Sequence, residues 1–228
     1  MNPYVNIHTH YNNHIGDNEF VEIQNIDVDN IVNVDVSHFY SIGIHPWKVG
    51  SEELRNSGIE ELSDLKSRCI GDFNVKAIGE CGLDRACDVD FEIQKEVFIK
   101  QIELSEKIAK PVIIHAVRTY SDIISIKKET KAKQTWIIHG FQGNMQSAEQ
   151  LLRHDGIYLS LGDVLFRNER RASELLNVIP LDRLFLETDV AERDIVEVYE
   201  KAASLSGIEM DKLRNNIFNN FVKIFGQI

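Results

Sequence analysis

Residues that can bind metal ions stand at or near the ends of six short apolar segments of this chain. They are His8, His10, His45, Glu80, His115, His139 and Asp189. Each segment is typical of a short buried β-strand. In a barrel of parallel strands the carboxyl ends of all strands meet at one face, where active sites form. One such strand says little, whereas six of them predict a metal centre at that face.

The pair His8 and His10 is the sharpest local signal. Alternate residues of a strand point to the same side, so both imidazoles are expected to project together. Neutral imidazole is a common ligand for zinc and other borderline metals. The sequence therefore predicts that both histidines bind metal.

Two further histidines and two carboxylates extend the predicted ligand set. His115 and His139 each end an almost wholly apolar segment and are expected to be ligands. Glu80 has two carboxylate oxygens, so we expect it to bridge two metal ions. Asp189 alternates with Glu187 along its segment, which predicts that Asp189 binds metal and orients water while Glu187 lies one layer deeper.

Other side chains are expected to play lesser parts. His45 is expected to line the mouth of the site and to contact substrate rather than metal. Cys81 and Cys87 have no base arranged beside them, which argues against thiol catalysis. Glycine-rich phosphate-binding loops are absent from the sequence. Three histidines end no apolar segment and are expected in loops or on the surface: His14, His38 and His154.

Stretches with helical periodicity separate the apolar segments. They cover residues 51–68, 91–108, 121–128, 145–153, 169–178, 194–205 and 211–225. This alternation predicts a parallel sheet with helices outside it. Eight strands result if Phe20–Ile26 is the second and Gly156–Ser160 the seventh, although Ile31–Val36 competes for the second place. We expect an α/β protein with a (β/α)8 TIM barrel; an open doubly wound sheet is the alternative, but it would not gather ligands from the first and last strands.

The bulk properties favour one large domain over residues 1–228. Hydrophobic residues make up 43% of the chain, and no Ser/Gly/Pro-rich stretch divides it. No apolar run approaches the roughly 18–20 residues of a membrane span. The start of the chain lacks the features of a secretory signal, and three cysteines without CxxC spacing fit a reduced, cytoplasmic protein. A net charge of −11 argues against a basic groove for long duplex DNA.

Taken together, these segments resemble the TatD family of metal-dependent hydrolases, within the amidohydrolase-like barrels. The resemblance runs from Asn6 to Asp189 and weakly into the last helical stretch. Its landmarks are Ile7-His8-Thr9-His10, Gly43-Ile44-His45-Pro46-Trp47, Ala77-Ile78-Gly79-Glu80-Cys81-Gly82-Leu83-Asp84, Pro111-Val112-Ile113-Ile114-His115, Ile138-His139-Gly140-Phe141 and Leu186-Glu187-Thr188-Asp189. The resemblance implies a divalent metal site, often binuclear, and phosphodiester hydrolysis, described for many members as DNase activity. It places the ligands at His8, His10, Glu80, His115, His139 and Asp189.

The sequence departs from the family pattern at several positions. Many relatives carry Asp where this chain has Asn6, and because Asn supplies no negative charge, we expect lower metal affinity. Arg85 replaces a common Tyr, and Arg118 stands one place later than the usual Arg. The Pro-containing loop that usually follows Asp189 is missing. These changes touch the substrate loops more than the metal ligands.

The resulting prediction is a metal-dependent hydrolase acting on ester bonds, a phosphodiesterase or deoxyribonuclease of TatD type. One or two divalent ions (Zn, Mn or Mg) would activate a water, with Asp189 and Glu80 as catalytic residues. His45, Arg118 and Arg85 are the predicted substrate contacts, and the expected substrate is a DNA end or a small phosphoester. An amidohydrolase-type enzyme on a lactone, amide or small phosphoester stays open, as does a non-enzymatic metal-binding protein. The sequence predicts no membrane association and gives no oligomeric state.

Overall fold

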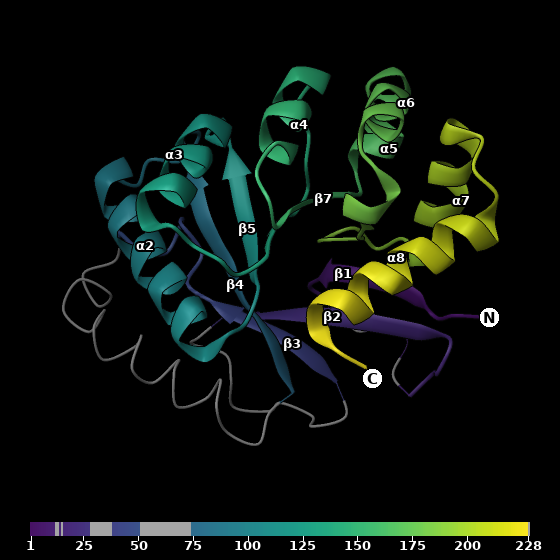
Figure 1. Ribbon diagram of the computed structural model, residues 1–228, viewed down its shortest axis with the longest axis horizontal. Helices are drawn as coiled ribbons and strands as arrows, with labels where there is room; N and C mark the ends of the chain where they lie inside the picture. Colours follow the sequence, from purple (N-terminus) through teal and green to yellow (C-terminus); the bar gives the residue numbers. More distant parts are fainter. Residues whose placement is uncertain (12–13, 15, 28–37, 51–73, 228) are drawn as a thin grey trace. The chain divides into compact units, whose positions relative to one another are not determined.

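The computed structural model describes residues 1–11, 14, 16–27, 38–50 and 74–227 (Figure 1). The eight strands form one sheet in the order of the chain. They are β1 (Tyr4–Thr9), β2 (Phe20–Asp27), β3 (Phe39–Gly43), β4 (Val75–Asp84), β5 (Val112–Val117), β6 (Trp136–Ile138), β7 (Ile157–Leu161) and β8 (Leu184–Leu186). Phe20–Ile26 is therefore the second strand, as predicted. The competing segment 31–36 and the predicted helix 51–68 lie outside the described residues.

The helices follow the strands as the periodicity predicted. They are α2 (Phe91–Ile108), α3 (Tyr120–Thr130), α4 (Met145–Leu152), α5 (Val164–Arg167), α6 (Glu169–Val178), α7 (Ile195–Ser206) and α8 (Met210–Phe225), with a short 3-10 turn at Leu181–Arg183. The short α5 and the 3-10 turn were not expected, because a single turn is too short to show a helical period. Within the described part of the chain, no helix has both the length and the apolar character needed to cross a bilayer.

The first strand and the last strand are joined, which makes the fold the expected (β/α)8 barrel. Thr9 and Asp189 form a parallel bridge. The backbone N–H of His10 donates to the carbonyl of Asp189 at 3.1 Å, and the N–H of Asp189 donates to the carbonyl of His8 at 3.0 Å. An open doubly wound sheet has no such pairing of its edges, so that alternative is wrong.

By internal packing the chain divides into two compact units. Unit 1 comprises Met1–Gln24 and Ile137–Ile228, and unit 2 comprises Asn25–Trp136. The expectation of one domain over residues 1–228 stays a prediction.

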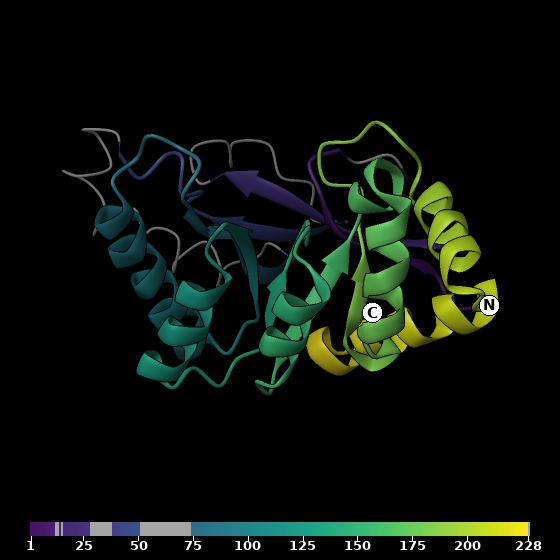
Figure 2. The same cartoon turned by 90° about the horizontal axis from the view of Figure 1, so that it is seen from above.

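Unit 1 holds β1, β7, β8 and the helices from α4 to α8. Its helices α6 and α7 pack side by side (Figure 2). Helix α8 buries the apolar stripe Leu213, Ile217 and Phe221 completely and ends at Gly226, as its periodicity predicted. The carboxyl ends of β1 and β8 lie beside each other because of their backbone pairing.

Unit 2 holds β3, β4 and β5 with helices α2 and α3. Strand β4 pairs in parallel with both β3 and β5, and α2 packs against β4. The side chain of Asp90 caps the start of α2 by accepting hydrogen bonds from the backbone of Glu92 and Ile93. Strand β4 continues past Glu80 to Asp84, so it carries two buried carboxylates instead of ending at the first.

Candidate metal centre

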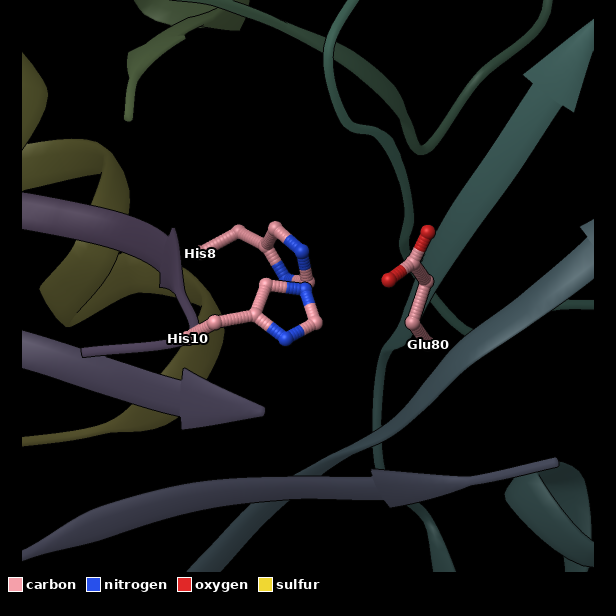
Figure 3. A group of neighbouring side chains, drawn as sticks. All are labelled: His8, His10 and Glu80. Carbon is pink, nitrogen blue, oxygen red and sulfur yellow. The ribbon is translucent and has the colours of Figure 1, made fainter. Parts of the chain in front are cut away.

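Unit 1 brings together His8, His10, His139 and Asp189. The Oδ1 atom of Asp189 lies 3.4 Å from Nε2 of His8 and 3.6 Å from Nε2 of His10. The ring centroids of His8 and His139 are 4.2 Å apart. His8, His139 and Asp189 each offer one ligand atom, and the three atoms lie within 4.8 Å of one another. His8 of β1 and His10, which follows the strand directly, point to the same side, as their alternation predicted (Figure 3).

The pairing of β1 with β8 explains how these residues meet. Asp189 follows β8 with a left-handed backbone, at φ 54°. Asp tolerates this conformation better than most residues, and the two backbone hydrogen bonds to β1 hold it there. Its carboxylate is thereby fixed at the end of the strand that carries His8 and His10.

Asn6 strengthens the same join from within the barrel. Its Nδ2 donates to Oγ1 of Thr188 at 2.8 Å, and its Oδ1 accepts from the backbone N–H of Thr188 at 3.0 Å. Asn6 Nδ2 also lies 3.2 Å from Oε1 of Glu22 on β2. A carboxylate therefore stands next to Asn6 although the residue itself is uncharged.

Glu187 lies one layer below Asp189, as predicted, and is completely buried. Its Oε1 accepts a hydrogen bond from the backbone N–H of Gly140 at 2.6 Å and lies 3.4 Å from Nδ1 of His139. A carboxylate behind a ligating histidine fixes the ring and its tautomer. Gly162 allows this packing, because a Cβ there would lie 2.7 Å from the carbonyl oxygen of Glu187.

Unit 2 forms a second group around Glu80, which Figure 3 labels on β4. Oε1 of Glu80 lies 2.8 Å from Nδ1 of His115 and 3.2 Å from Nε2 of His45. Nε2 of His115 faces Oδ2 of Asp84 at 3.1 Å. The glutamate is 5% exposed, so this group is largely shielded from water.

The position of His45 in this group supports a donor role for its imidazole. Its Nδ1 accepts a hydrogen bond from the backbone N–H of Trp47 at 3.2 Å. A neutral imidazole that accepts at Nδ1 carries its proton on Nε2. Nε2 then donates toward Glu80 and has no lone pair for a metal ion. The substrate-contact role of His45 stays a prediction.

Asp84 and Cys81 differ in their protonation. Burial alone would raise the pKa of Asp84, but hydrogen bonds from Trp47, Ala86 and His115 outweigh it, so the pKa is lowered and the group stays a carboxylate. Burial first, and the charge of Glu80 second, raise the pKa of the Cys81 thiol. The thiol therefore stays protonated, in agreement with the prediction against thiol catalysis.

The donor sets fit a divalent metal. A zinc ion bound tetrahedrally at about 2.1 Å holds its ligand atoms about 3.4 Å apart. The separations of Asp189 from His8 and His10 are 3.4 and 3.6 Å, so unit 1 has this spacing. In unit 2 the 2.8 Å between His115 and Glu80 is a hydrogen-bond separation, and these two groups must separate slightly to take a metal ion. Mixed imidazole and carboxylate ligands suit zinc, manganese and magnesium to different degrees and do not select one.

The two predicted arginine contacts are both exposed. Arg85 donates to Asp122 from Nη2 at 2.8 Å and lies over the ring of Phe91, 3.7 Å from its centroid. Arg118 follows β5 with a left-handed backbone, at φ 57°. The roles of both arginines in substrate binding stay predictions. To bind a phosphate, Arg85 must first release the carboxylate of Asp122.

Three buried amides that the sequence analysis did not single out hold the second group in place. Gln101 of α2 accepts from the N–H of Ile44 at 2.8 Å and donates to its carbonyl at 3.1 Å, immediately before His45. Gln94, two helical turns earlier, accepts from the N–H of Asp84 at 2.8 Å and donates to its carbonyl at 3.0 Å. Asn25 accepts from the N–H of Glu80 at 2.6 Å. No local pattern of the sequence marks these three amides, because only the packing of α2 on β4 and the pairing of the strands turn them inward.

His14 is more enclosed than predicted. It lies in a loop, as expected, but its side chain is only 13% exposed and stacks on Phe20 with ring centroids 3.7 Å apart. Its two ring nitrogens each lie 3.2 Å from a carboxylate oxygen, one of Glu22 and one of Asp194. Asp194 is 180 residues away, which is why the local pattern did not show this enclosure.

Comparisons with known proteins bear on the family and the fold of this chain. The family described as TatD related DNase matches residues 18–226. An uncharacterized metal-dependent hydrolase of Buchnera aphidicola is 36% identical over 66% of this chain and 58% of its own length. The uncharacterized metal-dependent hydrolase YcfH of Escherichia coli K12 is 30% identical over 82% of this chain and 73% of its own length. The crystal structure of YjjV, a TatD homologue from Escherichia coli K12, superposes with a TM-score of 0.84 at 21% identity and covers 99% of this chain and 98% of that one.

The match spans less than two thirds of the Buchnera relative. The likeness to YjjV, at its low identity, supports the fold alone.

Proposed function

This chain belongs to the family described as TatD related DNase, and from that premise we propose that it is a divalent-metal-dependent hydrolase of phosphodiester bonds that acts on DNA ends. The observation that carries the proposal is the group of His8, His10 and Asp189 at the joined ends of β1 and β8, with ligand spacing suited to a metal ion. Four proposed ligands come from unit 1 (His8, His10, His139 and Asp189) and two from unit 2 (Glu80 and His115). The bridging role of Glu80 stays a prediction.

A bound divalent ion would lower the pKa of a water and neutralise phosphoryl oxygens in the transition state. Within the chain, Asp189 is the proposed proton acceptor, because its carboxylate is fixed at the strand end and is 32% exposed, so water reaches it. The buried carboxylate of Glu187, 3.4 Å from Nδ1 of His139, would orient that ring from below. His45 would donate from Nε2 to an oxygen of the substrate in place of Glu80.

Arg118 and Arg85 are the proposed phosphate contacts. Guanidinium groups bind phosphate oxygens through paired N–H donors, which fixes the position of the phosphate as well as attracting it. Both side chains are exposed beyond the ends of β4 and β5, so they are accessible to a substrate. Arg85 has to break its ion pair with Asp122 before it can bind a phosphate, so Arg118 is the more direct phosphate contact.

The proposal is tested with protein loaded in turn with Zn²⁺, Mn²⁺ and Mg²⁺. Each form is assayed on single-stranded DNA, duplex DNA and a panel of lactones, amides and small phosphoesters, with metal content measured on the same samples. We expect cleavage of DNA ends that stops on chelation and returns with metal. Turnover of a lactone or amide without cleavage of any phosphodiester would establish the amidohydrolase alternative instead.

We also propose a cytoplasmic location. Cys81 and Cys87 are both free thiols in the structure. Free cysteines are typical of reducing compartments. Fractionation of cells expressing a tagged chain tests this, and recovery from an oxidising compartment would contradict it.

A further inference from the structure

The side chain of Trp47 is exposed to water and is also held in place by a hydrogen bond. Its side chain is 60% exposed. Its indole Nε1 nevertheless donates to Oδ2 of Asp84 at 2.6 Å, and Asp84 is only 3% exposed. The hydrogen bond to a buried carboxylate therefore holds a large aromatic surface in water in one orientation.

The ring borders the Glu80 group of unit 2. It lies edge-on to His45, with ring centroids 4.8 Å apart, and to His115, at 5.9 Å. Both histidines face Oε1 of Glu80. A substrate group that rests on Trp47 is therefore next to His45, the proposed substrate donor, and to His115, a proposed metal ligand.

The charge of the chain limits how a nucleic acid is held. With a net charge of −11, contacts between basic side chains and the phosphate backbone supply little attraction. Stacking of a base on an aromatic side chain needs no charge. It contributes about 1–3 kcal/mol per base and tolerates any sequence, because every base has a π-face.

We propose that Trp47 is a stacking platform for a nucleobase adjacent to the scissile phosphate. The substrate is then a base-bearing, single-stranded end, and a phosphoester without a ring binds less well. This inference rests on the proposed function and narrows its substrate class. Asp84 is a positioning residue in this arrangement, since it orients the indole.

The first test uses intrinsic fluorescence. The chain has two tryptophans, and Trp136 is completely buried. Of the two, only Trp47 can therefore have its fluorescence quenched by direct contact with an oligonucleotide. Metal-loaded protein is titrated with a phosphorothioate oligothymidylate and with an abasic oligomer of equal length and charge. We expect strong quenching by the first and little by the second. The quenching should persist in Trp136→Phe and disappear in Trp47→Phe.

Three outcomes of the titration overturn the inference. The first is equal quenching by both oligomers, and the second is no quenching by the base-bearing oligomer at millimolar concentration. Quenching that survives Trp47→Phe likewise assigns the signal to another site.

The second test separates stacking of a base on Trp47 from an effect of the hydrogen bond between Trp47 and Asp84. For base-bearing and abasic DNA ends, kcat/KM is measured in wild type, Trp47→Ala and Trp47→Phe. We expect Trp47→Ala to reduce the preference for the base-bearing end by about 5- to 150-fold, mainly through KM. Phenylalanine keeps a ring but lacks the indole N–H, so Trp47→Phe should retain most of the preference. An equal loss in both variants would show that only the hydrogen bond to Asp84 matters.

The two proposals fail in different ways. If wild type cleaves no phosphodiester with any metal, the proposed function fails, while the fluorescence titration still reports whether a base stacks. If wild type cleaves base-bearing and abasic ends equally well, the hydrolase stands and the stacking platform fails. Circular dichroism of both Trp47 variants establishes that they are folded.

Discussion

Asn6 offers a sharp test of the structure, because restoring the residue that many relatives carry should harm this chain. Asn6 is 1% exposed, and its Nδ2 group donates both to Thr188 and to Oε1 of Glu22. Asn6→Asp replaces that donor by an oxygen. On sequence grounds the new charge should favour metal binding, but in the structure it meets the carboxylate of Glu22, whose side chain is only 9% exposed.

The expected cost follows from the distance. The native Nδ2–Oε1 separation is 3.2 Å, and two carboxylates there would relax outward. Two unit charges about 4 Å apart repel by about 4 kcal/mol at an effective dielectric constant of about 20. The lost hydrogen bond removes about 1 kcal/mol more, and relaxation returns part of the sum. We expect the free energy of unfolding to fall by about 3 kcal/mol.

The assay is urea unfolding of metal-free protein at pH 8, with Glu22→Gln as the matched control. In the double variant Asn6→Asp, Glu22→Gln, the new amide donates to the aspartate, and stability should return to within about 1 kcal/mol of Glu22→Gln alone. Asn6→Asp with wild-type stability, or with the same loss in both backgrounds, would refute the placement of Glu22 beside Asn6.

Three further predictions concern catalysis, pH and salt. Asp189→Asn should lower hydrolysis by roughly 10²–10⁴-fold with an unchanged circular dichroism spectrum, and near-normal turnover at full metal loading would remove Asp189 from the site. Burial lowers the pKa of Lys127 to about 8 from 10.5. As the pH rises from 8, the Lys127 ammonium group therefore loses its proton in the folded state before it does so in the unfolded state. The free energy of unfolding should rise by up to about 3 kcal/mol between pH 8 and 10.5. Lys127→Met should lack this rise, and parallel pH profiles for the two proteins would contradict the burial of the ammonium group. Duplex DNA should bind weakly with a shallow salt dependence, and a slope of log affinity against log salt of about −5 or steeper would be inconsistent with the charge of the chain.

The grouping of His8, His10 and Asp189 and the bounds of two helices could be predicted, because the periodicities of strands and helices determine them. His8 and His10 share a face because a strand repeats every two residues, and Asp189 meets them because the first and last strands of a barrel are neighbours. Helices 91–108 and 169–178 begin and end where their apolar spacing predicted. These features depend on local patterns and on one topological rule.

The supporting polar contacts could not be predicted in the same way. Gln94 and Gln101 look like ordinary polar positions on an amphipathic helix, and only the packing of α2 on β4 shows that they face inward. His14 is enclosed by Glu22 and by Asp194, 180 residues away. Such pairings depend on register between distant elements, which no local pattern specifies.

The join between β1 and β8 also sets an order of assembly during protein synthesis. Asn6 and Thr188, which hydrogen-bond to each other, are 182 residues apart, and unit 1 consists of two segments between which the whole of unit 2 is encoded. At about 5–20 residues per second, a ribosome needs roughly 10–40 s to traverse that interval. Unit 2 is continuous and can begin to fold during this time. The strand β1, whose Val5 and Ile7 are completely buried in the folded chain, can pair with β2 early but not with β8 until the end of that interval. The His8, His10 and Asp189 group therefore forms only after most of the chain has been made.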